Sequence, residues 1–91
     1  EVLEHVERPD LFLLRLREMA ASAANSLVTT CVNSPAVDHI TCFRSVREVE
    51  ALCADSGLMV RETLALPYPG TSLAESERQR LAVNLALVLS P

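Results

Sequence analysis

Side chains that can bind a proton or a metal ion occur at an informative spacing near the start of the chain. They are Glu1, Glu4 and His5, with His39 further along. Positions i, i+3 and i+4 lie on one side of a helical turn, and a loop could bring His39 to them. An imidazole can act as a general base near neutral pH, and carboxylates with imidazoles can hold Mg²⁺ or Mn²⁺. A structural, hydrogen-bonded turn is the remaining interpretation.

The residues around this pattern predict where it lies in a fold. Val2 and Leu3 are typical of the end of a buried strand, which Glu4 and His5 then interrupt. Pro9 suits the first turn of a helix, because its missing N–H would be unpaired there in any case. Open α/β sheets bind their ligands at such strand ends. We therefore expect these polar side chains at the ligand-binding edge of a sheet.

A helix is expected from residue 9 to about residue 21. Apolar side chains at helical spacing predict its buried face, and charged side chains mark its exposed side. The predicted buried residues are Phe12, Leu16, Met19 and Ala23, and the exposed ones are Arg15, Arg17 and Glu18.

Three strands and a second helix should follow. The strands are expected over residues 26–32, 59–66 and 81–89. Ser45-Val46-Arg47-Glu48 forms a capping box that begins the helix, and Gly57 suits its end. The last two strands lack a crossover helix of normal length between them, so they should pair antiparallel. We expect four strands in the spatial order first, second, fourth, third, with a functional loop over residues 33–44 and a polar segment or short helix over residues 72–80.

Composition limits the kind of protein. With 91 residues, 49% of them hydrophobic, the chain can form one small domain and is too apolar to be disordered. Its net charge of −4 argues against a broad nucleic-acid or anionic-membrane surface. Residues 81–89 are too few to span a bilayer as a helix. Three cysteines without a Cys-x-x-Cys pair favour buried, reduced thiols and a cytoplasmic location.

Several motifs in a fixed order carry a resemblance to a known family. They are Glu1-Val2-Leu3-Glu4-His5-Val6, Leu27-Val28-Thr29-Thr30, Asp38-His39-Ile40 with Phe43-Arg44-Ser45, and Glu48-Val49-Glu50-Ala51-Leu52 with Ser56-Gly57-Leu58. This order resembles the C-terminal half of class I S-adenosylmethionine-dependent methyltransferases and covers nearly all of the chain. The resemblance implies an α/β fold: a Rossmann-like methyltransferase sheet whose parallel strands end in an antiparallel strand pair, with helices packed on the sheet.

The same resemblance has implications for domain organisation. It implies that residues 1–91 are the C-terminal part of one methyltransferase domain, whose N-terminal cofactor-binding half is absent from this sequence. We expect the fragment alone to be inactive and to need that half, or a partner chain, to complete its sheet. The family's usual Pro-Gly-Gly turn is replaced by Ala23-Ala24-Asn25, in a connection remote from the site.

The function that the resemblance implies is methyl transfer from S-adenosylmethionine to an O, N or C atom of a small molecule. This segment would form the acceptor side of the site. The residues expected to contact the cofactor are Glu1, Val2, Leu3 and Glu4. The expected catalytic residues are His5 and His39, and the expected substrate-binding residues are Asn33, Phe43 and Tyr68. Nucleic acid and membrane are not expected as partners.

Two alternatives remain open. A divalent metal held by Glu1, Glu4, His5 and His39 would make the chain similar to small-RNA 2′-O-methyltransferases and some ubiquinone-pathway O-methyltransferases. It would then act on RNA or a catechol-like substrate. A non-catalytic α/β module for assembly or regulation is the other alternative. A glycine-rich loop and a ribose-binding acid upstream of Glu1 would favour the enzyme.

Overall fold

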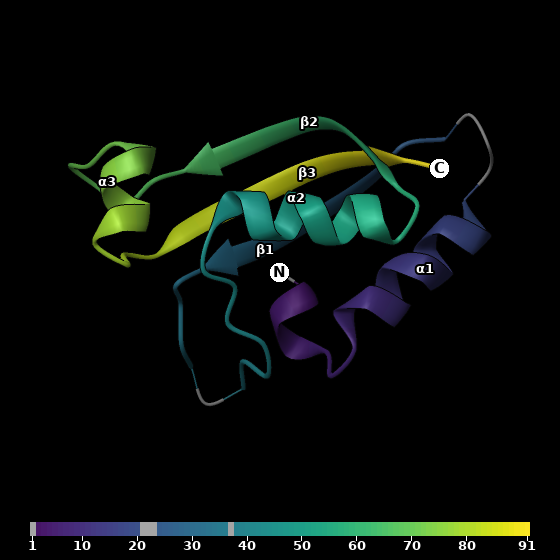
Figure 1. The fold of residues 1–91 in the computed structure, drawn as a ribbon, viewed down its shortest axis with the longest axis horizontal. Coiled ribbons are helices and arrows are strands. Elements are labelled where there is room, and N and C mark those ends of the chain that lie inside the picture. The colour runs from purple at the N-terminus through teal and green to yellow at the C-terminus, as the bar shows by residue number, and fades with distance from the viewer. Residues whose placement is uncertain (1, 21–23, 37) are drawn as a thin grey trace.

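The computed structural model describes residues 2–20, 24–36 and 38–91. Within them the chain forms a three-stranded sheet with helices (Figure 1). In chain order the elements are the 3₁₀ helix η1 (Leu3–His5), α1 (Pro9–Met19), β1 (Ser26–Val32), α2 (Val46–Asp55), β2 (Met59–Leu66), α3 (Leu73–Arg78) and β3 (Val83–Ser90). No helix of the described residues is long and apolar enough to cross a membrane.

The last strand, β3, lies between β1 and β2 and runs antiparallel to both (Figure 1). Leu87 is paired with Val28 on one side and with Thr63 on the other. The expected central position of the last strand and its antiparallel pairing with β2 are confirmed. The strand pairs of the described sheet are antiparallel, so a Rossmann-like parallel sheet is not established by this structure.

The prediction of a strand at the start of the chain is wrong for the described residues. The N–H of Val2 does donate to the carbonyl oxygen of Thr29 in β1, at 3.0 Å, but the chain then turns into η1. In a strand, Leu3 and Glu4 would point to opposite faces. In the 3₁₀ turn both side chains are fully buried, Leu3 in the core and Glu4 against β1, which explains why the turn replaces the strand. The expectations for Glu1 lie outside the described residues.

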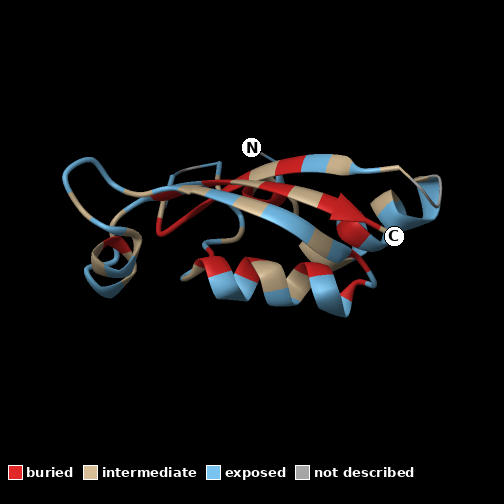
Figure 2. Cartoon of the chain, turned by 90° about the horizontal axis from the view of Figure 1, so that it is seen from above, coloured by how far each residue is buried: buried red, intermediate tan, exposed pale blue. Residues whose placement is uncertain are grey.

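Helix α2 covers one face of the sheet, as the view from above shows (Figure 2). The capping box is present: the Ser45 hydroxyl accepts from the Glu48 N–H at 3.1 Å, and the Glu48 carboxylate accepts from the Arg44 N–H at 2.9 Å. Gly57 ends the helix with φ +84°, a conformation that glycine adopts without strain. The buried side chains Val46, Val49 and Cys53 belong to the hydrophobic core that α2 shares with the strands.

The buried face of α1 differs from the expected one. Leu13 is fully buried and Leu16 packs against the core, whereas Phe12 is exposed and Met19 is 84% exposed. Apolar residues of α1 lie at several positions around its axis, so their spacing alone does not identify the buried face. The Arg17 Nε–H donates to the Gly57 carbonyl oxygen at 3.0 Å and fixes the helix against the end of α2. Ala23, also expected on this face, lies outside the described residues.

The cysteines follow the expectation in part. Cys31 and Cys53 are buried, but Cys42 is exposed, and all three are free thiols. Burial, and to a smaller extent the Glu50 carboxylate, raise the pKa of Cys53 to about 11. The Cys53 thiol therefore stays protonated and unreactive at neutral pH.

The face of the sheet opposite α2 is open and carries exposed apolar side chains beside the polar Glu62 and Asn84. Directly paired residues lie on one face, so the pairs of Leu27 with Val88 and Leu64 with Ala86 place these side chains together. Leu27, Leu64 and Leu66 are exposed there. No helix of the described residues covers this face (Figure 2), so only one side of the sheet is packed.

Replacing Leu13 by Ala should lower the free energy of unfolding by about 2–5 kcal/mol, because it leaves a cavity in the core. Leu14, the next residue of α1, is 38% exposed and is the matched control. Leu14→Ala should cost less than about 1 kcal/mol, since little packing is lost. Urea unfolding followed by circular dichroism measures both, and equal losses would contradict the observed helix orientation.

Candidate functional site

Two histidines from separate segments meet beside the carboxyl end of β1. His5 belongs to η1, and His39 belongs to the loop between β1 and α2. Their ring centroids are 4.8 Å apart, and the rings meet edge to face at 80°. One potential ligand atom each from His5, Asp38 and His39 lie within 4.8 Å of one another. These three residues and Glu4 are called the histidine cluster below.

Backbone hydrogen bonds hold the loop against η1. The N–H groups of Ile40 and Thr41 both donate to the carbonyl oxygen of Glu4, at 2.7 and 3.1 Å. At the base of the loop, the Asn33 N–H donates to the Phe43 carbonyl oxygen at 2.7 Å. The loop therefore closes on itself at one end and is anchored to η1 at the other, which places His39 beside His5.

The hydrogen bonds of both imidazoles leave the same ring atom free. His5 Nδ1 lies 2.9 Å from the carbonyl oxygen of Asp38, and His39 Nδ1 is hydrogen-bonded to the carbonyl oxygen of Ser34. A carbonyl oxygen only accepts, so Nδ1 carries the hydrogen and Nε2 of each neutral ring keeps its lone pair. Metal-binding and basic histidines are commonly oriented in this way by a backbone carbonyl. Both Nε2 atoms can thus accept a proton or bind a cation.

Glu4 supplies a buried carboxylate beneath these rings. Its Oε2 accepts from the Thr30 hydroxyl at 2.9 Å and from the Cys31 thiol at 3.3 Å. Its Oε1 is buried without a hydrogen-bond partner among the described residues, 3.9 Å from His5 Nε2. A buried oxygen without a partner is costly, so a donor or cation bound between Glu4 and His5 would be stabilised.

Asp38 is the member of the cluster that sequence reasoning missed as a functional residue. Its carboxylate Oδ2 lies 3.7 Å from His5 Nδ1, and its carbonyl oxygen is the partner of that same nitrogen. The available signal was its position directly before His39 in a loop after a strand. Sequence spacing from Glu4 and His5 could not reveal it, because the loop fold brings it there.

The other residues expected at the site lie in three different surroundings. Leu3 is fully buried in the core, so only its backbone could face a cofactor, whereas Val2 is partly exposed. Phe43 is buried in the core, and its backbone forms an isolated parallel β-bridge with Val32 of β1. Tyr68 is exposed in the turn before α3; its N–H donates to the Ser76 hydroxyl at 3.1 Å, and it forms no hydrogen bond with the cluster in the described chain.

Asn33 lies close to the cluster along the chain. It is buried at the end of β1 with φ +53°, and its side-chain amide donates to the Arg44 carbonyl oxygen at 3.3 Å. Ser34, the next residue, accepts from His39. The structure therefore joins His5, His39, Glu4 and Asn33 in one region and leaves Tyr68 outside it.

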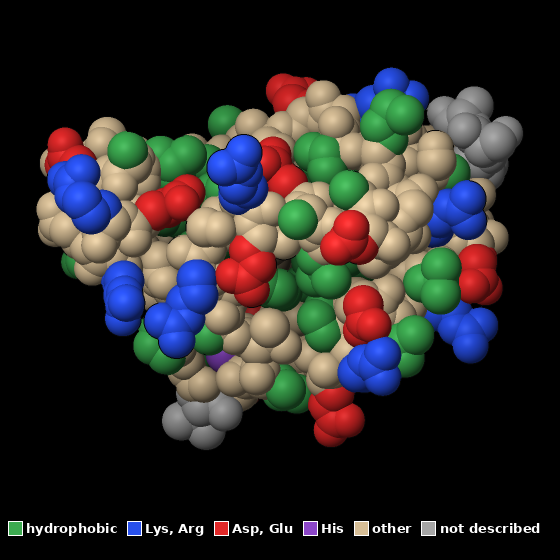
Figure 3. Space-filling model, viewed as in Figure 1, with side chains coloured by type: hydrophobic (Ala, Val, Ile, Leu, Met, Phe, Trp, Pro, Cys, Tyr) green, Lys and Arg blue, Asp and Glu red, His purple; other side chains and the backbone are tan. Residues whose placement is uncertain are grey.

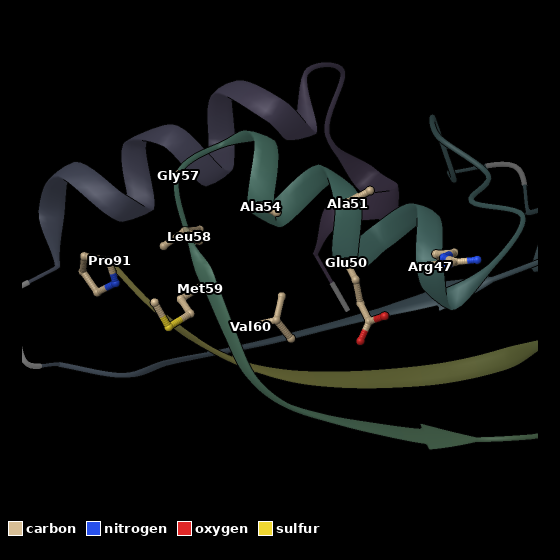
Figure 4. A pocket seen from close by; sticks show the side chains of 9 residues that line it. All are labelled: Arg47, Glu50, Ala51, Ala54, Gly57, Leu58, Met59, Val60 and Pro91. Atoms are coloured by element: carbon tan, nitrogen blue, oxygen red, sulfur yellow. The ribbon is translucent and has the colours of Figure 1, made fainter.

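A wider groove lies between α2 and the start of β2 (Figure 4). It has a volume of about 690 Å³, with Arg47 and Glu50 towards one end and Met59 and Pro91 towards the other. The Glu50 carboxylate already accepts from the Thr63 hydroxyl at 2.6 Å. The groove contains no residue of the histidine cluster, and nothing in the structure shows what would occupy it.

Comparisons of the chain with protein-family models, curated proteins and solved structures found no match.

Replacing Thr30 by Val should lower the free energy of unfolding by about 1–3 kcal/mol, because it removes a donor to the buried Glu4 carboxylate at nearly constant volume. Thr63→Val is the matched control, since the hydroxyl of Thr63 also donates to a carboxylate, that of the half-exposed Glu50. Water can replace that donor, so the control should lose less than about 1 kcal/mol. Chemical unfolding at pH 7 measures both variants; similar losses would contradict the role given to Thr30.

Proposed function

We propose that this chain forms the acceptor side of an S-adenosylmethionine-dependent methyltransferase site, with the histidine cluster as its proton acceptor. The observation that carries the proposal is the meeting of His5 and His39, each with a free Nε2, beside the end of β1. These are the two residues to which the motif resemblance gives a catalytic role.

The residues of the cluster have separate tasks in this proposal. When bound, the cofactor would supply an electrophilic methyl group and would leave as a neutral thioether, with the electron pair of the broken S–CH3 bond on sulfur. The acceptor's O–H or N–H proton passes to Nε2 of His39, and the bonding electron pair stays on the acceptor atom that attacks. The Ser34 carbonyl oxygen holds the ring of His39 in the tautomer that this step needs. Positioning and proton removal are the main contributions that such a site can make.

The proposal also requires that the open face of the sheet be covered. A sheet in a Rossmann-like domain has helices on both faces, and here the face carrying the exposed Leu27, Leu64 and Leu66 is open. Residues outside this sequence, or a partner chain, would cover it. The acceptor is proposed to be a small molecule, because the net charge of −4 does not favour a nucleic-acid surface.

His39→Ala should lower kcat for methyl transfer about 100-fold, the usual range for loss of a general base, and should leave cofactor affinity unchanged. The assay is transfer of radiolabelled methyl groups by the full-length protein to a panel of small hydroxylated and aminated acceptors. Ile40→Ala is the matched control, because this exposed side chain lies in the same loop while its N–H still binds Glu4. No transfer by the wild type to any acceptor, or an equal loss in both variants, would refute the proposal.

A metal-assisted O-methyltransferase is the second candidate, and the unpartnered Oε1 of Glu4 favours it. His5, Asp38 and His39 provide two imidazole nitrogens and one carboxylate whose potential ligand atoms lie within 4.8 Å of one another, a set that suits Mn²⁺ and similar cations. Glu1, the fourth ligand expected from the sequence, lies outside the described residues. Among the described residues, Asp38 is the carboxylate that lies with the two imidazoles. The cation would polarise an acceptor hydroxyl of RNA or a catechol-like molecule.

If this candidate holds, Mn²⁺ should broaden the NMR signals of His5 and His39, and Asp38→Asn should weaken Mn²⁺ binding about 10–100-fold, as loss of a ligand or its hydrogen-bonded neighbour does. Asp55→Asn is the control, since Asp55 is exposed at the far end of α2. A chelator should then abolish methyl transfer. Undiminished activity with chelator and unbroadened histidine signals would reject the metal and leave His39 as a simple base.

A further inference from the structure

Two arginines without partners line adjoining pockets at the carboxyl end of β1. One pocket, of about 480 Å³, is lined by Asn33, Arg44, Glu77 and Arg80. The other, of about 350 Å³, is lined by Asn33, Pro35, Cys42, Arg44 and Arg80. Asn33, Arg44 and Arg80 belong to both, and they are called the arginine pocket below.

The guanidinium groups of Arg44 and Arg80 are not used by the fold. Within the described residues, no carboxylate lies within 4.0 Å of either group, and neither group donates a hydrogen bond. Arg8 binds Asp10, Arg17 binds the Gly57 carbonyl oxygen and Arg61 binds Ser90. Within the described residues Arg47 and Arg78 also have no partner, so Arg44 and Arg80 are distinguished by sharing a pocket. In a chain of net charge −4, two unneutralised cations on one pocket form a local positive site. A guanidinium offers paired N–H donors that match carboxylate and phosphate oxygens.

The backbone of the arginine pocket is held in a conformation unusual for its residues. Arg80 has φ +58° and Asn33 has φ +53°. Asparagine tolerates the left-handed region, but arginine adopts it only at a cost that glycine would avoid. The Arg80 N–H donates to the Glu77 carbonyl oxygen at 3.2 Å, which fixes this turn after α3. A strained residue kept at a pocket is commonly a functional one.

The arginine pocket is connected to the histidine cluster through neighbouring residues of the chain. Asn33 is followed directly by Ser34, whose carbonyl oxygen holds His39, and the Asn33 amide binds the backbone of Arg44. In the space-filling view, basic side chains gather at this end of the molecule, and a histidine is visible next to them (Figure 3). A ligand anchored at the arginines would therefore extend towards the imidazoles.

We propose that Arg44 and Arg80, with Asn33, bind an oxyanion, a carboxylate or phosphate group of the methyl acceptor. The oxyanion lies in the pocket of about 350 Å³ that Pro35 and Cys42 line. Glu77 lines only the pocket of about 480 Å³, and its carboxylate would repel an anion there. The proposal of an oxyanion site is based on the unpaired guanidinium groups, whereas its assignment to the methyl acceptor rests on the proposed function.

The test is titration of the complete protein with inorganic phosphate and, separately, with acetate, at constant ionic strength maintained by NaCl. The arginine Nε–H signals in ¹H–¹⁵N NMR spectra report binding. Signals of Arg44 and Arg80 should shift and saturate with at least one of the two anions, and the tighter one identifies the oxyanion. Arg44→Gln and Arg80→Gln should each weaken binding about 10-fold, the loss of one charge-assisted hydrogen-bond pair. Arg78→Gln, an exposed arginine of α3 outside the pocket, should change it less than about twofold.

Arg80→Gly separates binding from folding. It should raise the melting temperature, because glycine adopts the left-handed conformation without strain, while anion binding weakens as in Arg80→Gln. Shifts that do not saturate with either anion, or an equal loss in Arg78→Gln, would overturn the oxyanion site.

The assay with acceptors distinguishes this proposal from the methyltransferase. If anions bind as expected and the full-length protein transfers no methyl group, the oxyanion site stands and its assignment to a methyl acceptor is overturned. If methyl transfer occurs and Arg44→Gln and Arg80→Gln leave the KM of anionic acceptors unchanged, the methyltransferase stands and the oxyanion site is overturned. A KM raised about 10-fold in both variants at unchanged kcat supports both.

Discussion

The candidate site depends on the burial of one carboxylate, that of Glu4. Taking a carboxylate out of water is costly unless donors surround it, and Thr30 and Cys31 of β1 donate to one of its oxygens. The carbonyl oxygen of the same residue accepts from Ile40 and Thr41. Glu4 thus connects η1 to both the strand and the loop. The loop in turn brings Asp38 and His39 to His5, so this one residue fixes the relative positions of the cluster.

The second feature of the site is its separation of charge. The histidine cluster combines two carboxylates with two imidazoles, whereas the neighbouring pocket carries Arg44 and Arg80. Asn33 and Ser34 connect the two regions through hydrogen bonds. An acceptor with an anionic group at one end and a hydroxyl or amine at the other would match this arrangement. The arginines would orient such a molecule, and an imidazole would take its proton.

The strongly patterned elements could be predicted from the sequence. The Ser45 to Glu48 capping box, the glycine at position 57 and the apolar run of β3 each depend on local rules, and each lies where expected. The N-terminal strand could not be predicted correctly, because the burial of both Leu3 and Glu4 depends on β1 and on the loop. The buried face of α1 was predicted wrongly for a similar reason, since Phe12 and Leu13 are both strongly apolar and only the tertiary packing of Leu13 in the core distinguishes them.

Some residues of the candidate site could likewise be predicted from the sequence, and others could not. Glu4, His5 and His39 were identified from residue type and from the motif resemblance, and the structure brings them together. Asp38, Arg44 and Arg80 were missed because their proximity arises from loop folding and from the position of α3. No local spacing encodes those contacts, so they appear only in three dimensions.

The most direct test of the account is the protonation pattern of the two imidazoles, observed by long-range ¹H–¹⁵N correlation NMR at pH 8. The account predicts that the neutral rings of His5 and His39 both carry their hydrogen on Nδ1, and that their Nε2 signals are those of a bare, proton-accepting nitrogen. Spectra in which both rings carry their hydrogen on Nε2 would contradict it, because neither lone pair would then face an acceptor or a cation.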